Sequence, residues 1–75
     1  MGKKADPQIL FGQRLRALRE DRELSQEQLA HKAGLDRTYV SSCERGKRNV
    51  SLSTICKFAE ALGVAPHELL TGLAQ

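Results

Sequence analysis

Apolar residues recur every three or four positions along most of the chain, which is the spacing of one face of an α-helix. The first run contains Phe11, Leu15 and Leu18 with charged residues between them, and it predicts an amphipathic helix over residues 8–22. No stretch alternates apolar and polar residues for long enough to predict a strand. The pattern therefore predicts an all-α fold.

Capping residues mark where the next two helices begin and end. Ser25 and Gln28 have the spacing of a capping box at the start of a second helix, and Gly34 is suited to end it. Asp36 is expected to cap a third helix, which Gly46 ends. A helix, a tight turn containing glycine and another short helix form the helix-turn-helix pattern.

Two further helices complete the prediction of five. Ser51 is expected to cap the fourth helix and Gly63 to end it. Its predicted core-facing residues are Leu52, Ile55, Phe58, Ala59 and Leu62. Pro66 suits the first position of a short fifth helix, which would turn Leu69 and Leu70 inward. The expected fold is a compact domain of five helices.

The length of 75 residues and the 40% hydrophobic content predict one small domain over residues 8–75. Residues 1–7 are expected to form a flexible basic arm that ends at Pro7. The sequence has no signal-peptide core and no segment long enough to cross a membrane, so no membrane partner is expected. Cys43 and Cys56 are too few for a disulfide framework, which favours the cytoplasm.

The net charge of +3 is small, and its distribution says more than its size. Residues 1–24 carry six basic and four acidic residues, and residues 36–48 carry four basic and two acidic ones. Residues 49–75 carry one basic and two acidic residues. This asymmetry suits a protein with one face for a polyanion and another for a protein partner.

The third predicted helix carries a polar stripe that contains no acid. On a helical wheel, Val40 and Cys43 lie opposite this stripe. Its members are Arg37, Thr38, Ser41, Ser42 and Arg45. Arginine can pair with guanine in the major groove, and short hydroxyl side chains let a helix approach the base edges. The alternative is an ordinary exposed helix that is rich in serine and arginine.

Neighbouring residues favour the interpretation as a DNA-binding surface. Gln26 stands at the start of the second helix, where its amide and the helix N-terminus can meet a phosphate. Lys47, Arg48 and Asn49 follow the third helix, where they can grip the DNA backbone beside the groove.

Residues 14–63 resemble the Cro/CI-type (Xre) helix-turn-helix family of bacterial and phage transcription regulators, whose fold is lambda-repressor-like. The matching text is LSQEQLAHKAGLDRTYVSSCERGKRNVSLSTICKFAEALGV. Within the family, residues 35–51 are most similar to the controller proteins of restriction–modification systems. Valine at position 50 favours the similarity to controller proteins, since many Xre proteins have proline there. Ala65 departs from the serine or aspartate common in the family, so the cap before the fifth helix should be weak.

The resemblance implies a role for each matching residue. The base readers would be Arg37, Thr38, Ser41, Ser42 and Arg48, and the phosphate contacts would be Gln26, Tyr39, Arg45, Asn49 and Ser51. Arg19 and Glu44 match a structural ion pair that joins the first helix to the third. For Tyr39 the alternative is a half-buried aromatic ring that shields the core.

Catalytic, metal and cofactor sites are not expected. The two histidines and two cysteines stand far apart, as His31, Cys43, Cys56 and His67, and have no spacing typical of metal ligands. The chain has no nucleophile elbow and no phosphate-binding loop, and it has little interior for a water-excluding site. We therefore expect no enzyme activity, no cofactor and no small-molecule ligand.

An apolar cluster near the C-terminus predicts self-association. Its members are Val64, Leu69, Leu70 and Leu73. A twofold homodimer would place two reading helices one DNA turn apart on a pseudo-palindromic double-stranded operator. The chain's own concentration would then set operator occupancy. Two alternatives stay open: the cluster only packs the fifth helix, or the domain is an antitoxin or related Xre module whose main partner is a protein.

Overall fold

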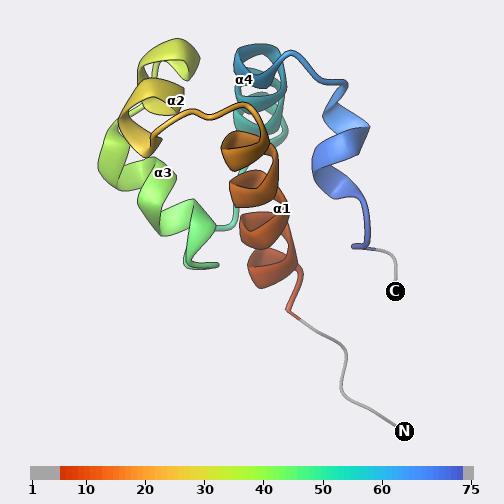
Figure 1. Ribbon diagram of the computed structural model, residues 1–75. Helices are drawn as coiled ribbons and strands as arrows, with labels where there is room; N and C mark the ends of the chain where they lie inside the picture. Colours follow the sequence, from red (N-terminus) through yellow and green to blue (C-terminus); the bar gives the residue numbers. More distant parts are fainter. Residues whose placement is uncertain (1–5, 74–75) are drawn as a thin grey trace, which may run out of the picture.

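The computed structural model describes residues 6–73 as a small helical bundle (Figure 1). The four α-helices are α1 (Pro7–Asp21), α2 (Gln26–Ala33), α3 (Arg37–Glu44) and α4 (Leu52–Leu62), and a 3-10 helix, η1, follows at Pro66–Leu70. No strand occurs within the described residues, so the all-α prediction is confirmed. The predicted arm at residues 1–7 lies outside the described residues except for Asp6 and Pro7.

The expectation of five α-helices is wrong in its last member. The segment Pro66–Leu70 is a 3-10 helix of five residues. Ala65 at its N-cap has no side-chain oxygen to offer, and the Glu68 carboxylate accepts a long hydrogen bond of 3.4 Å from the Ala65 N–H. A weakly capped segment of this length cannot repay the cost of nucleating an α-helix.

Most of the capping residues predicted from the sequence cap their helices in the structure. Both hydrogen bonds of the Ser25–Gln28 capping box are present, and Ser51 Oγ accepts a bond from the Thr54 N–H. Gly34 ends α2 in the left-handed conformation at φ 70°. Asp36 departs from its predicted role: it occupies the N-cap position of α3, but its side chain makes no capping hydrogen bond.

The core has the residues that the helical periodicity predicts, with two corrections. Phe11, Leu15 and Leu18 of α1 pack with the apolar faces of α2, α3 and α4. Leu52 was expected in the core and is instead 79% exposed. It is the first residue of α4, one turn before the buried Ile55, so it lies past the edge of the core. Leu70 was expected to face inward and is 38% exposed.

Gly12 lets α1 lie directly against the C-terminal end of α3. A Cβ atom at Gly12 would come within 2.7 Å of the Glu44 carbonyl oxygen and closer still to that of Cys43. Both neighbouring atoms belong to the backbone, so a side chain at residue 12 could fit only if α3 moved. The glycine thereby fixes how close α1 and α3 pack.

Arg14 of α1 and Arg22, the C-cap of α1, bind carbonyl oxygens at the other side of the bundle. Arg14 Nε donates to the Glu68 carbonyl oxygen at 2.7 Å, and Arg22 Nε donates to that of Leu62 at 2.6 Å. Leu62 is the last residue of α4, where carbonyl groups have no helical partner. Part of the positive charge counted in the first third of the chain therefore fastens α1 to α4 and η1.

The arrangement gives the molecule two separate sides. α3 packs against α1 and α2, whereas η1 packs against α1 and α4. Figure 1 shows α3 and η1 on opposite sides of α1. Among the described residues, no helix combines the length and apolar character needed to cross a lipid bilayer.

We expect Gly12→Ala to destabilise the fold by about 1–3 kcal/mol or more, because the added methyl group overlaps backbone atoms of α3. In an exposed helix the same change would stabilise by up to about 1 kcal/mol, so the sign is diagnostic. Urea unfolding followed by circular dichroism measures the change. Gln13→Ala, at the exposed neighbouring position, is the control and should be nearly neutral. An unchanged midpoint for Gly12→Ala would show that α1 and α3 are not held this closely.

Candidate nucleic-acid interface

The polar stripe of α3 lies on the surface of the bundle. Arg37, Thr38 and Arg45 are exposed, and Ser41 and Ser42 are half-buried beside them. Arg37 is the first residue of α3, and Arg45 is its C-cap, so the two arginines lie at opposite ends of the stripe. The exposed side of α3 thus presents two cations with hydroxyl groups between them, which is a set of groups able to bind base edges and phosphates.

The opposite face of α3 anchors the helix in the core. Val40 is 0% exposed and Cys43 is 1% exposed. Burial raises the pKa of the Cys43 thiol above its usual value, because the thiolate would lose its water, while a hydrogen bond with Tyr39 acts in the other direction. The thiol therefore stays neutral and serves as a small apolar group.

Two contacts hold long side chains along the stripe. Arg45 Nη1 donates to Ser41 Oγ at 2.9 Å, one turn earlier on the helix. The Arg48 guanidinium lies over the half-buried Tyr39 ring, 5.0 Å from its centroid, in a cation–π arrangement. The second contact ties the segment after α3 back to α3 itself, so Arg48 and Tyr39 form one surface.

The remaining predicted phosphate contacts lie at the starts of α2 and α4. Gln26 is the first residue of α2 and is half-buried. Asn49 is exposed, and Ser51 is the N-cap of α4. The Ser51 hydroxyl bonds to Ser53 and Thr54 as well as to the helix backbone. Apart from the one N–H that bonds to each N-cap serine, the first N–H groups of both helices have no partner within their own helix, which favours a phosphate.

The Arg19 and Glu44 side chains meet beneath this surface. Arg19 Nε lies 2.6 Å from Glu44 Oε2, and Arg19 Nη2 donates to Glu44 Oε1 at 3.0 Å. The two side chains are 11% and 4% exposed, and Arg19 Nη1 also donates to the Leu24 carbonyl oxygen at 2.7 Å. The hydrogen bond to Glu44 is the largest cause of a raised pKa for Arg19. The Arg19 guanidinium therefore keeps its positive charge at neutral pH.

Gln26 and Arg19 both donate to the Glu44 carboxylate, and the sequence did not predict the contact from Gln26. Gln26 Nε2 donates to Glu44 Oε1 at 3.0 Å, across 18 residues of sequence. Nothing in the spacing of the two residues signals this bond, since it depends on how α2 and α3 cross. Arg14 and Arg22 were likewise counted only as surface charge.

The members of the C-terminal apolar cluster differ in exposure. Leu69 is fully buried and packs η1 onto the core, so it offers no surface to a partner, and this corrects its predicted place in an interface. Val64 is partly buried, whereas Leu70 is 38% exposed. Leu70 and Leu73 border a surface pocket of about 140 Å³.

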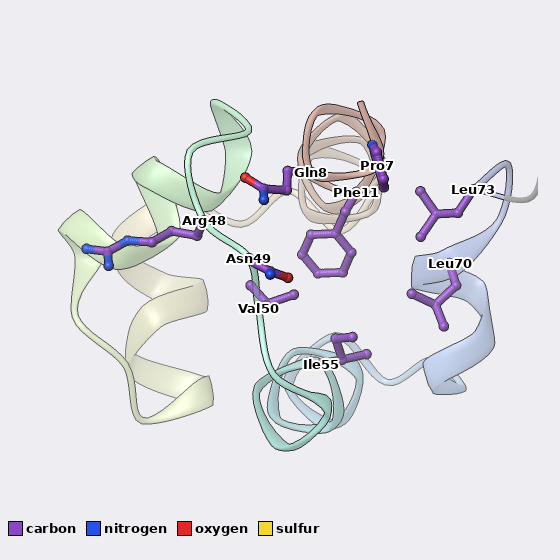
Figure 2. A pocket seen from close by; sticks show the side chains of 9 residues that line it. All are labelled: Pro7, Gln8, Phe11, Arg48, Asn49, Val50, Ile55, Leu70 and Leu73. Carbon is purple, nitrogen blue, oxygen red and sulfur yellow. The ribbon is translucent and has the colours of Figure 1, made fainter. Parts of the chain in front are cut away.

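This pocket separates the apolar cluster from the segment after α3. Figure 2 shows Phe11, Ile55, Leu70 and Leu73 converging on it from α1, α4 and the C-terminal segment. Arg48 also borders the pocket, but its guanidinium points away from it, toward Tyr39. The lining is mainly apolar, so the pocket suits another apolar surface better than a phosphate.

A metal-binding cluster is not found among residues 6–73: no three side chains of histidine, cysteine, aspartate or glutamate lie close enough to share an ion. Cys43 is in the core, and Cys56 is exposed on α4.

Comparison with known proteins gives a consistent result. The helix-turn-helix domain family matches residues 10–71. The control protein C.BamHI of Bacillus amyloliquefaciens is 52% identical over 63 residues, which cover 83% of this chain and 78% of that protein. The control protein C.MunI of a Mycoplasma species is 46% identical over 69 residues, or 91% of this chain and 93% of that protein. The crystal structure of the restriction–modification controller protein C.AhdI from Aeromonas hydrophila has a TM-score of 0.81 at 58% identity, covering 83% of this chain and 94% of that one.

We expect Glu44→Ala to lower both stability and DNA affinity, because it leaves the Arg19 guanidinium buried without its partner. The loss of stability should be about 3–5 kcal/mol, as for other broken buried pairs. Arg37→Ala should lower DNA affinity alone, since Arg37 is exposed and its side chain makes no hydrogen bond with the other described residues. Thermal melts and DNA titrations of both variants measure these effects. A melt in which Arg37→Ala is the less stable variant would contradict this division of roles.

Proposed function

The chain belongs to the Xre-type helix-turn-helix family, and we propose that it is a sequence-specific, double-stranded DNA-binding transcription regulator that controls a restriction–modification system. One observation carries the DNA-binding part: the acid-free stripe of α3 is on the surface, while the opposite face of that helix is fully buried. The control proteins among its relatives support the proposed target.

The proposed contacts follow from position along α3 and its flanks. Arg37, Thr38, Ser41 and Ser42 would enter the major groove and read bases, with Arg48 reading at the flank. Arg45, Tyr39, Gln26, Asn49 and Ser51 would bind phosphates on either side of the groove. The free N–H groups at the starts of α2 and α4 support two of these phosphate contacts.

A homodimer on an inverted-repeat operator completes the proposal. One reading helix contacts few base pairs, so a twofold pair of helices one DNA turn apart gains specificity. The helix η1, which carries the exposed Leu70, lies across α1 from α3 (Figure 1), so a partner copy bound at the apolar surface of Leu70 and Leu73 leaves the reading face free. Val64, between α4 and η1, is a further proposed member of this interface. Operator occupancy then depends on protein concentration in the cytoplasm, which is where we place this regulator.

Selection of bound sequences from a random pool of duplex DNA tests the proposed function. We expect an enriched inverted repeat. On this repeat, the logarithm of the binding constant should fall with the logarithm of the salt concentration, with a slope of roughly −0.9 for each phosphate neutralised. Arg45→Ala should make that slope shallower. A slope near zero with no enriched sequence would overturn the DNA-binding proposal and favour a domain whose main partner is a protein.

Leu70→Glu should convert the dimer to a monomer, because it places a charge in the apolar surface. Sedimentation equilibrium at several concentrations measures the association, and Leu73→Glu should act in the same way. Gln13→Glu adds the same charge on an exposed position of α1 and should leave association unchanged. If both leucine variants associate like the parent chain, the dimer surface lies elsewhere.

A further inference from the structure

The Glu44 carboxylate is a junction of three helices. Its two oxygens accept three hydrogen bonds, two from Arg19 of α1 and one from Gln26 of α2, while Glu44 itself ends α3. The Glu44 side chain is 4% exposed, so these bonds are shielded from competing water. A shielded carboxylate with three donors holds those donors in fixed directions.

The bond from Gln26 has a consequence for the rest of its amide. A glutamine amide is planar and carries two N–H groups and one carbonyl oxygen. One N–H of Gln26 is directed at Glu44 Oε1, so the orientation of the second is set by the same plane. Gln26 is half-buried at the first position of α2, beside backbone N–H groups that have no helical partner.

We propose that Glu44 is a positioning residue for DNA binding: through Oε1 it holds the Gln26 amide so that the second N–H faces a phosphate of the bound DNA. This inference rests on the proposed DNA-binding function. It gives the Arg19–Glu44 pair a second role besides joining α1 to α3, since the pair sets the direction of a contact made by a third helix.

The charge of Glu44 makes this role separable from simple electrostatics. A carboxylate near DNA repels phosphates, so its neutralisation alone should strengthen binding. Glu44→Gln removes that charge at nearly constant volume, yet it replaces an acceptor oxygen by an NH₂ group among three donors. The positioning role therefore predicts weaker binding from a change that electrostatics alone predicts to strengthen it.

A double-mutant cycle at residues 26 and 44 provides the test. Using the inverted repeat enriched from the random pool, we expect Glu44→Gln to weaken binding at least fivefold in the parent chain. In the Gln26→Ala background the same change should weaken binding by a factor at least threefold smaller, because the amide to be positioned is gone and only the effect through the Arg19 pair remains. Gln26→Ala should leave the salt slope unchanged, since an uncharged amide releases no counterion. Gln13→Ala is the matched control and should bind like the parent chain.

A second measurement needs no change at Glu44 and so does not depend on how well Glu44→Gln folds. In the free protein, the Gln26 side-chain amide proton that is bonded to Glu44 should exchange with water more slowly than the amide protons of the exposed Gln13, by tenfold or more. Circular dichroism melts confirm that each variant is folded at the temperature of the binding assay.

Three results would overturn the inference. The first is an equal exchange rate for the side-chain amides of Gln26 and Gln13, and the second is unchanged or tighter DNA binding by Glu44→Gln. The third is a double variant whose loss of affinity equals, within twofold, the product of the losses in the two single variants. Each of these leaves the proposed function standing, because the parent chain still binds its repeat. Absence of any bound sequence for the parent chain would instead count against the function itself.

Discussion

The buried carboxylate of Glu44 is the contact on which the arrangement of the first three helices depends. It lies at the end of α3 and takes up both the Arg19 guanidinium from α1 and the Gln26 amide from α2. Arg19 in turn binds the Leu24 carbonyl oxygen in the turn before α2. Because Gly12 brings α1 directly against the same end of α3, this polar junction and the closest backbone approach occur side by side. The orientation of the polar stripe on α3 follows from both.

The elements of the fold that depend on nearby residues were predictable from the sequence. The ends of α2 and α4 follow from Ser25 and Gly34, and from Ser51 and Gly63, because caps and left-handed glycines act within a few residues. Elements that depend on distant residues were not. Leu52 fits the apolar period of α4, yet no other helix reaches it. The segment at Pro66 has the residues of a short helix, but it lacks the cap and the length for an α-helical turn to persist.

In the candidate site, too, the features set by nearby residues were predictable and those set by distant residues were not. The stripe on α3 could be found because helical periodicity alone puts its members on one side, and the buried Val40 and Cys43 agree with that division. The Gln26–Glu44 hydrogen bond could not be found, since the two residues are 18 apart and on different helices. Arg14 shows the opposite case: its charge was evident in the sequence, but its partner, the Glu68 carbonyl oxygen, lies 54 residues away.

A buried ion pair is a poor way to gain stability, since apolar residues of similar size often stabilise as well or better. Replacing Arg19 and Glu44 by leucine and methionine could therefore keep α1 packed on α3. Such a pair has no acceptor for Gln26 and none of the directionality of a carboxylate, so the amide at the start of α2 would be free to rotate. Burying the charged pair costs desolvation free energy, but the carboxylate fixes the directions of the hydrogen-bond donors around it. In a domain whose proposed task is to place several donors against DNA at once, fixed directions are worth that cost.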